Sequence, residues 1–272
     1  MARGAAGRGA GGATGEGGAG GGAAGGQGPD WSCLGNATWP AAAGPKVVMR
    51  MRFVATASVF PPDDLAVDFC HALDLDCETP LVAAVPVAAD GSVAVEVDAG
   101  VAGYFRAVSP TTLPAFVYFT RPAWSVPADD TTLTAPLPLV TPNELAQLAT
   151  LNGRTADASR GIFLSVALDC ERRRSLGVRL SSPDLDPEAT VFYIANTLPR
   201  ADATETDPVG VAGVLNMPTG ARLLEARRAS DGALIAKANL YIRPGALTVT
   251  DFEPTPVAYE MTSGTTPPGA GR

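Results

Sequence analysis

The feature that most constrains this fold is a two-residue alternation of apolar and polar side chains in short runs. In residues 46–57, Arg50 and Arg52 alternate with the apolar side chains of Val47, Met49, Met51 and Phe53. Such a period is typical of a half-buried β-strand. Similar runs recur along the chain, separated by turns rich in the 30 glycines and 24 prolines. The pattern therefore predicts an all-β fold with many short strands.

The runs fall into two groups, which we interpret as two tandem β-sandwiches of transthyretin-like or immunoglobulin-like type. The first is expected over residues 46–140 and the second over residues 160–253. Hairpin turns are expected at Asp90-Gly91 and Asp231-Gly232. Leu81–Ala88 is expected to be a third strand of the first unit. One large β-barrel across residues 46–253 is the alternative fold.

A single short helix is expected between the two units, over residues 141–153. Thr141-Pro142-Asn143-Glu144 has the form of a capping box with proline at the first helical position. Leucines at 145, 148 and 151 follow at helical spacing, and Asn152-Gly153 ends the run.

The two ends of the chain lack the strand pattern. Residues 1–28 are half glycine, which predicts a disordered linker because the segment cannot bury enough apolar surface to offset its ordering entropy. Residues 29–45 are expected to be an ordered, irregular segment docked on the body, and residues 257–272 a disordered tail.

The charge and hydropathy of the chain restrict its partners. A net charge of −8 disfavours nucleic acid, and no apolar run is long enough to span a membrane. An export signal would show a basic segment followed by an apolar one, and no such pattern is visible near Met1. We interpret the leader as a stalk between an anchor, such as that of a lipoprotein, and the folded body.

Four cysteines, an even number in a chain rich in loops, indicate an oxidising compartment. Three pairings are possible. We favour Cys70 with Cys77, since so short a loop closes easily, and this leaves Cys33 with Cys170. Four buried free thiols are the alternative. The protein is therefore expected to be extracytoplasmic, either secreted or tethered to the cell surface.

A turn–strand–turn pattern in the second unit resembles the carboxypeptidase regulatory-like domain. It runs from Thr206-Asp207-Pro208-Val209-Gly210 through a strand to Asn216-Met217-Pro218-Thr219-Gly220. Glycine permits a positive φ, and proline presets a turn. The resemblance implies a transthyretin-like sandwich of a bacterial envelope protein, with Thr206, Asp207, Gly210, Asn216, Pro218 and Gly220 as fold-forming residues. It also implies an accessory, scaffold or adhesive role without catalytic residues.

Catalytic and metal-binding patterns are weak. His71 is the single histidine and lies beside Cys70, so nucleophilic catalysis or a zinc site would need a residue from a closed loop. The carboxylates between Asp63 and Glu78 suit calcium by composition, but their spacing matches no calcium loop. Lys46 and Lys237 are the only lysines that an intramolecular isopeptide bond could use. We expect no catalytic residues, no metal and no cofactor.

The sequence therefore predicts a non-catalytic binding or structural module of the cell envelope. Its expected partners are other envelope proteins or a polysaccharide. Trp124, in a proline-rich loop, is a possible ligand contact, which would suit a carbohydrate-binding accessory module. A hydrolytic enzyme with an unrecognised acidic site is the remaining alternative.

Overall fold

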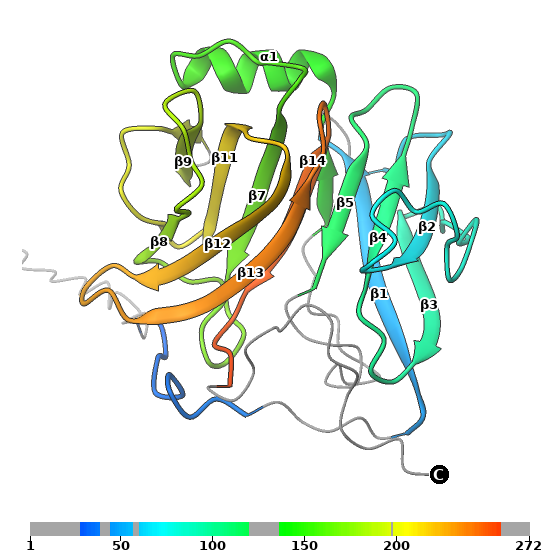
Figure 1. Cartoon of the computed structure of the whole chain (residues 1–272), viewed down its shortest axis with the longest axis horizontal. Coiled ribbons are helices and arrows are strands. Elements are labelled where there is room, and N and C mark those ends of the chain that lie inside the picture. Colours follow the sequence, from blue (N-terminus) through cyan, green and yellow to red (C-terminus); the bar gives the residue numbers. More distant parts are fainter. Residues whose placement is uncertain (1–27, 39–43, 57–59, 120–135, 197, 257–272) are drawn as a thin grey trace, which may run out of the picture.

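The computed structural model describes residues 28–38, 44–56, 60–119, 136–196 and 198–256, and it confirms an all-β fold with one helix (Figure 1). Six strands precede the helix in the described residues: β1 Lys46–Ala55, β2 Ala66–His71, β3 Ser92–Asp98, β4 Gly103–Val108, β5 Ala115–Tyr118 and β6 Leu137–Leu139. Eight follow it: β7 Gly161–Ala167, β8 Val178–Ser181, β9 Thr190–Ala195, β10 Leu198–Arg200, β11 Val211–Met217, β12 Gly220–Arg228, β13 Leu234–Ile242 and β14 Leu247–Phe252.

The helix α1, Pro142–Leu151, begins where the sequence predicts it. Thr141 caps it: the Thr141 hydroxyl accepts from the Glu144 amide, and the Glu144 carboxylate accepts from the Thr141 amide. Ala149 is the buried residue of the helix and packs against Phe192 and Leu215. Within the described residues, no helix is both long and apolar enough to cross a membrane.

One eight-stranded sheet runs through both halves of the chain, in the order β10-β9-β11-β7-β14-β5-β4-β2. The two halves meet where β5 and β14 pair in parallel, with Ala115 opposite Leu247 and Val117 opposite Val249. Each of the two expected sandwiches therefore contributes strands to one shared sheet. The two strands that pair here lie over a hundred residues apart in the sequence. The short-range alternation of apolar and polar residues therefore cannot predict their pairing.

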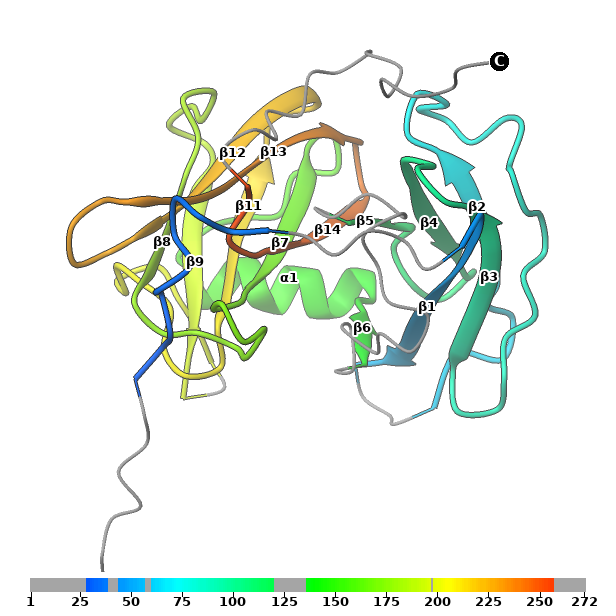
Figure 2. The ribbon, with the colours of Figure 1, turned by 90° about the horizontal axis from the view of Figure 1, so that it is seen from below.

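Two three-stranded sheets cover this large sheet. Because successive side chains of a strand face opposite ways, each large-sheet strand contributes to both faces. Phe105 and Val117 pack with the β3-β1-β6 sheet, whereas Tyr104 and Phe116 pack with β12 and β13 of the β13-β12-β8 sheet. The two views show β12 and β13 on the opposite side of β7 and β14 from α1 (Figures 1 and 2).

One expected strand is wrong. Leu81–Ala88 forms no strand; a single bridge joins Val82 to Phe69, and the Val85 amide donates to the Val67 carbonyl. Pro80 directly precedes this stretch and Pro86 lies within it, and proline supplies no amide hydrogen for a ladder. The segment covers the edge of β2 without extending the sheet.

The segment over residues 28–38 is ordered and docks on the second unit, with Trp31 and Leu34 packed against the core that β12 and β13 cover. The predictions for residues 1–27 of the leader, for the tail over residues 257–272 and for Trp124 fall outside the described residues. The bounds of the six segments given in the sequence analysis remain predictions.

Candidate functional site

The cysteines form two disulfides, Cys33–Cys170 and Cys70–Cys77, which are the pairs that the sequence favours. His71 lies at the start of the shorter loop, where its Nδ1 accepts from the Leu73 amide at 3.1 Å. This bond stabilises the turn that carries the loop. His71 therefore has a structural contact, and its neighbour Cys70 is oxidised and offers no thiol.

The residues of the predicted turn motif hold neighbouring loops together. Thr206 is buried; its hydroxyl donates to the Ser175 carbonyl at 2.8 Å and accepts from the Val178 amide at 3.0 Å. The Asp207 carboxylate accepts from the amides of Val209 and Asn196. These contacts fix the start of β11 against β8, which is a structural role.

The two glycines of the motif have different surroundings, which gives a matched test. Both have positive φ, +70° at Gly210 and +93° at Gly220. A Cβ at Gly210 would lie 2.9 Å from the Ser175 backbone nitrogen, while a Cβ at Gly220 would meet nothing within 4 Å. We expect Gly220→Ala to cost about 1–2 kcal/mol from backbone strain alone. Gly210→Ala should cost clearly more in urea unfolding; equal costs would contradict the contact at Ser175.

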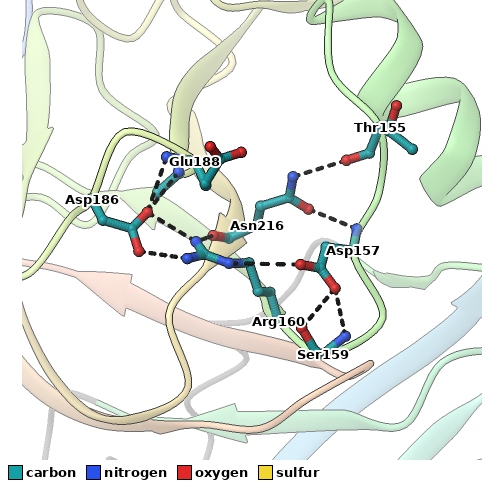
Figure 3. Close-up of polar contacts among 8 residues, drawn as sticks. Thr155, Asp157, Ser159, Arg160, Asp186, Glu188 and Asn216 are labelled. Carbon is teal, nitrogen blue, oxygen red and sulfur yellow. Dashed lines mark hydrogen bonds and ion pairs between the residues drawn. The ribbon is translucent and has the colours of Figure 1, made fainter.

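The densest polar cluster surrounds Arg160, directly before β7 (Figure 3). Its guanidinium donates to Asp186 Oδ1 at 2.9 Å and Oδ2 at 2.5 Å, and also to the Asn216 carbonyl at 2.6 Å. Asp157 Oδ2 lies 3.8 Å from Arg160 Nε. The Asn216 side chain bonds the Asp157 amide and the Thr155 carbonyl. The α1–β7 connection, the β8–β9 connection and the end of β11 therefore meet at Arg160.

Asn216 occupies a conformation that suits its role. Its φ is +52°, a region that asparagine adopts more readily than most residues. The pairing of β11 with β7 shifts register between Val214 and Met217, so the backbone turns here. This turn directs the amide toward residues 155 and 157 (Figure 3).

The electrostatics of this cluster oppose acid–base catalysis. The hydrogen bond from Arg160 lowers the pKa of Asp186 to about 2, and the hydroxyl and amide of Ser159 lower the pKa of Asp157. A general acid needs a pKa raised towards the working pH. Both carboxylates instead stay ionised and hydrogen-bonded at neutral pH. The cluster therefore works as a clamp between loops.

The ion pair between Asp186 and Arg160 should make the stability of the protein depend on pH in the acid range. Because the folded pKa lies below the ordinary value of 3.8, the stabilisation is complete above about pH 4 and is lost as the pH falls towards 2. Asp186→Asn should lower the melting temperature at pH 7 and flatten its decline in acid. The control is Asp231→Asn: its pKa is also about 2, but its Arg228 partner lies three residues away on one hairpin. A larger loss from Asp231→Asn would contradict the clamp.

A second cluster surrounds Arg243, which follows β13 and is 7% exposed. Its guanidinium lies 3.8 Å from the centroid of the Phe116 ring, a cation–π contact. It donates to the Tyr118 hydroxyl at 3.1 Å and also to the Leu75 carbonyl in the Cys70–Cys77 loop. Arg243 thus links that loop to the second unit.

Two of the tyrosines beside Arg243, Tyr104 and Tyr118, are neutral at physiological pH. Burial raises the pKa of Tyr104 to about 12 and also raises the pKa of Tyr118. The Tyr104 hydroxyl donates to the Asp74 carbonyl at 2.6 Å, so it too holds the short disulfide loop. These groups are poor candidates for a general base.

Two carboxylates of the acidic stretch between Asp63 and Glu78 are engaged in contacts within the protein. Asp68 forms an ion pair with Arg106 at 2.7 Å, and the Asp74 carboxylate accepts from the amides of Glu78 and Thr79. Across the described ranges, no group of three or more histidine, cysteine, aspartate or glutamate side chains could hold a metal ion. The calcium hypothesis thus has no preformed site in this part of the chain.

The lysines do not form the buried arrangement that an isopeptide bond would need. Lys46 pairs with Asp98 across β1 and β3, and Lys237 pairs with Glu225 across β13 and β12. Both side chains are about half exposed. Their contacts are those of surface ion pairs.

Sequence reasoning located Asn216 but missed Arg160, Asp186 and Arg243. The sequence pattern that could have pointed to the Arg160 cluster is the Asp157-Ala158-Ser159 turn, in which the Asp157 carboxylate accepts from the Ser159 amide at 2.8 Å. The bridging contacts of the two arginines carry no local pattern, because they reach partners such as Asp186 and Leu75, which lie 26 and 168 residues away.

The fold and these clusters define a disulfide-bonded all-β protein. No known protein family and no curated protein matches its sequence. Among solved structures, the Bacillus anthracis TIE protein shares 9% identity with a TM-score of 0.25, over 77% of this chain and 34% of that chain. A streptococcal ancillary pilin shares 11%, with a TM-score of 0.24 over 76% and 68% of the two chains.

The shaft pilin SpaA from Lactobacillus rhamnosus GG, in a variant form, shares 12% identity, with a TM-score of 0.22 over 78% of this chain and 98% of that chain. This chain thus spans about a third of the TIE protein. TM-scores this low do not carry a functional argument, and the resemblance to the carboxypeptidase regulatory-like domain remains a prediction.

Proposed function

We propose that the protein is a non-catalytic binding or structural module that works outside the cytoplasm. The observation that carries this proposal is the Cys33–Cys170 disulfide, which joins cysteines 137 residues apart. Cytosolic reductants keep thiols reduced, whereas such bridges persist in oxidising compartments. The described residues contain no free cysteine, which supports the same location.

The assignment to a non-catalytic class is supported by how the polar clusters are built. Asp157, Asp186 and Asp207 each accept hydrogen bonds that fix a loop, and Arg160 and Arg243 bridge segments remote in sequence. An active site would keep at least one titratable group poised near the working pH. Tyr104 and Asp186 instead have pKa values near 12 and 2.

Within this class, we propose other envelope proteins or a polysaccharide as partners and carboxypeptidase regulatory-like sandwiches as the building units. The acidic body, with a net charge of −8, supports partners that are neither nucleic acid nor anionic lipid. The carbohydrate-binding version depends on Trp124, which lies outside the described residues.

The test of location is the thiol state of the protein in the cells that make it. Thiols are blocked at lysis and the peptides are mapped without reduction. We expect two cystines, Cys33–Cys170 and Cys70–Cys77. Free thiols at all four positions would remove the extracytoplasmic proposal.

The test of partner class is a glycan array with wild type, Trp124→Ala and Phe60→Ala, the last as a control because Phe60 is an exposed aromatic residue. Sugar binding that Trp124→Ala abolishes and Phe60→Ala retains supports the carbohydrate version. Binding that survives Trp124→Ala, or no binding at all, contradicts it and leaves a protein partner.

A further inference from the structure

The turn over residues 168–174 meets the chain segment that precedes the fold. Cys33 is bonded to Cys170, and the Cys170 amide donates to the Asp30 carbonyl at 2.9 Å. The Asp169 carboxylate, 2% exposed, accepts from the amides of Asp30, Glu171 and Arg173. The segment over residues 28–38 is therefore fixed to this turn by a covalent bond and a buried carboxylate.

The same turn meets the segment that leaves the fold. The Leu168 amide donates to the Phe252 carbonyl at 2.8 Å. Arg172 Nε lies 3.1 Å from Glu253 Oε2, and the Glu253 side chain is 1% exposed. Figures 1 and 2 show the residues after β14 close to the blue segment over residues 28–38, at the end of the molecule remote from α1.

We infer that this turn is a mechanical junction, through which tension between the two flanking segments passes from Cys33 to Cys170 and on to Glu253, leaving residues 34–169 outside the covalent load path. The inference goes beyond the proposed function, because it concerns what happens when the chain is pulled from both sides. It requires only the disulfide and the contacts around it.

The covalent connectivity explains why the first unit is shielded. The disulfide closes a loop that contains β1 to β6, α1 and β7, so a force on the flanking segments cannot extend these residues while the bond is intact. An extracellular module under tension would in this way keep its first unit unstretched.

The strand directions explain where the junction yields. β7 and β14 are parallel neighbours, with Phe252 opposite Ala167. Tension enters at Cys170, after the end of β7, and leaves at Glu253, after the end of β14. Both strands are thus pulled from the same end, so their hydrogen bonds are loaded one after another. The Arg172–Glu253 ion pair is loaded before the ladder and sets the first rupture.

The first experiment stretches the full chain between its two ends in an optical trap. Relative to oxidised wild type, Cys33→Ala/Cys170→Ala should lengthen the fully unfolded chain by about 470 Å at about 3.6 Å per residue, because 137 residue separations are freed and the Cys70–Cys77 bridge still withholds 7. The control, Cys70→Ala/Cys77→Ala, lies inside the closed loop and should leave the unfolded length unchanged.

The second experiment measures the rate of first rupture at constant force in the oxidised chain. Glu253→Gln should raise this rate about tenfold, since it removes a charge-assisted contact at the load point. Arg172→Gln changes the less buried partner and should do the same. The matched control is Glu225→Gln, which removes a carboxylate bound to Arg227 and Lys237 on β12 and β13. Circular dichroism checks that each variant is folded.

Two results would overturn the inference. One is an oxidised wild-type chain that extends to the length of the variant without the Cys33–Cys170 bridge. The other is a rupture rate of folded Glu253→Gln and Arg172→Gln that equals that of Glu225→Gln. The second result leaves the proposed extracytoplasmic function intact. The first would also count against that function, because both rest on the Cys33–Cys170 bridge, and the thiol state in cells then tests the function separately.

Discussion

Replacing both Cys33 and Cys170 with alanine is expected to lower the free energy of unfolding by about 5 kcal/mol. The bridge closes a loop of 137 residues, and its loss restores the corresponding conformational entropy to the unfolded chain. The same relation gives about 2 kcal/mol for Cys70→Ala/Cys77→Ala, because that loop spans only 7 residues. The two double variants thus form a matched pair with the same chemistry and different loop lengths.

Urea unfolding of the oxidised proteins measures this difference. The urea midpoint should fall further for the variant without the long bridge. Wild type under reducing conditions should be less stable than either variant, because it lacks both bridges. Equal losses from the two variants would show that native-state strain or residual structure, and not loop length, controls the effect.

Arg243→Ala is expected to cost about 3 kcal/mol, the second-largest effect. The substitution removes the cation–π contact with Phe116 and the guanidinium hydrogen bonds to the Leu75 carbonyl and the Tyr118 hydroxyl. It also disconnects the Cys70–Cys77 loop from the second unit. The loss should therefore exceed that of a surface arginine by several fold.

Two controls separate the parts of the Arg243 effect. Arg243→Met keeps an apolar side chain over Phe116 but donates no hydrogen bond, so its cost measures the lost donors. Arg222→Ala removes an arginine that donates only to Pro218 and Thr219, three and four residues away, and should cost less than about 1 kcal/mol. Urea midpoints for the three variants that rank Arg222→Ala as the most costly would contradict the bridging role of Arg243.

Much of the secondary structure was readable from the sequence because its causes are local. The alternation around Met49 and Met51 is a strand whose odd-numbered residues are buried. The Thr141–Glu144 capping box begins the helix as predicted. The failure at Leu81–Ala88 has a local cause as well, because Pro80 precedes the stretch and Pro86 lies within it, and neither can donate to a strand ladder.

The candidate clusters were only partly readable. A turn pattern predicts fold-forming roles for Thr206 and Gly210. In the structure, the Thr206 hydroxyl bonds Ser175 and Val178, and Gly210 lies so close to Ser175 and Ala167 that a Cβ would not fit. The charge of Arg160 or Arg243 is visible in the sequence, but its partner is not. An arginine bound to a carbonyl 168 residues away looks in the sequence like any surface arginine.

The sequence by itself determined that this protein is built from short strands, has one capped helix between two groups of strands, and holds four cysteines suited to two bridges. Each of these follows from spacings of a few residues. Only the tertiary structure decided that β5 and β14 join both groups into one sheet and that the 168–174 turn fixes both flanking segments. Strand order and remote ion pairs depend on which faces pack together across the whole molecule, and that free energy has no short-range period.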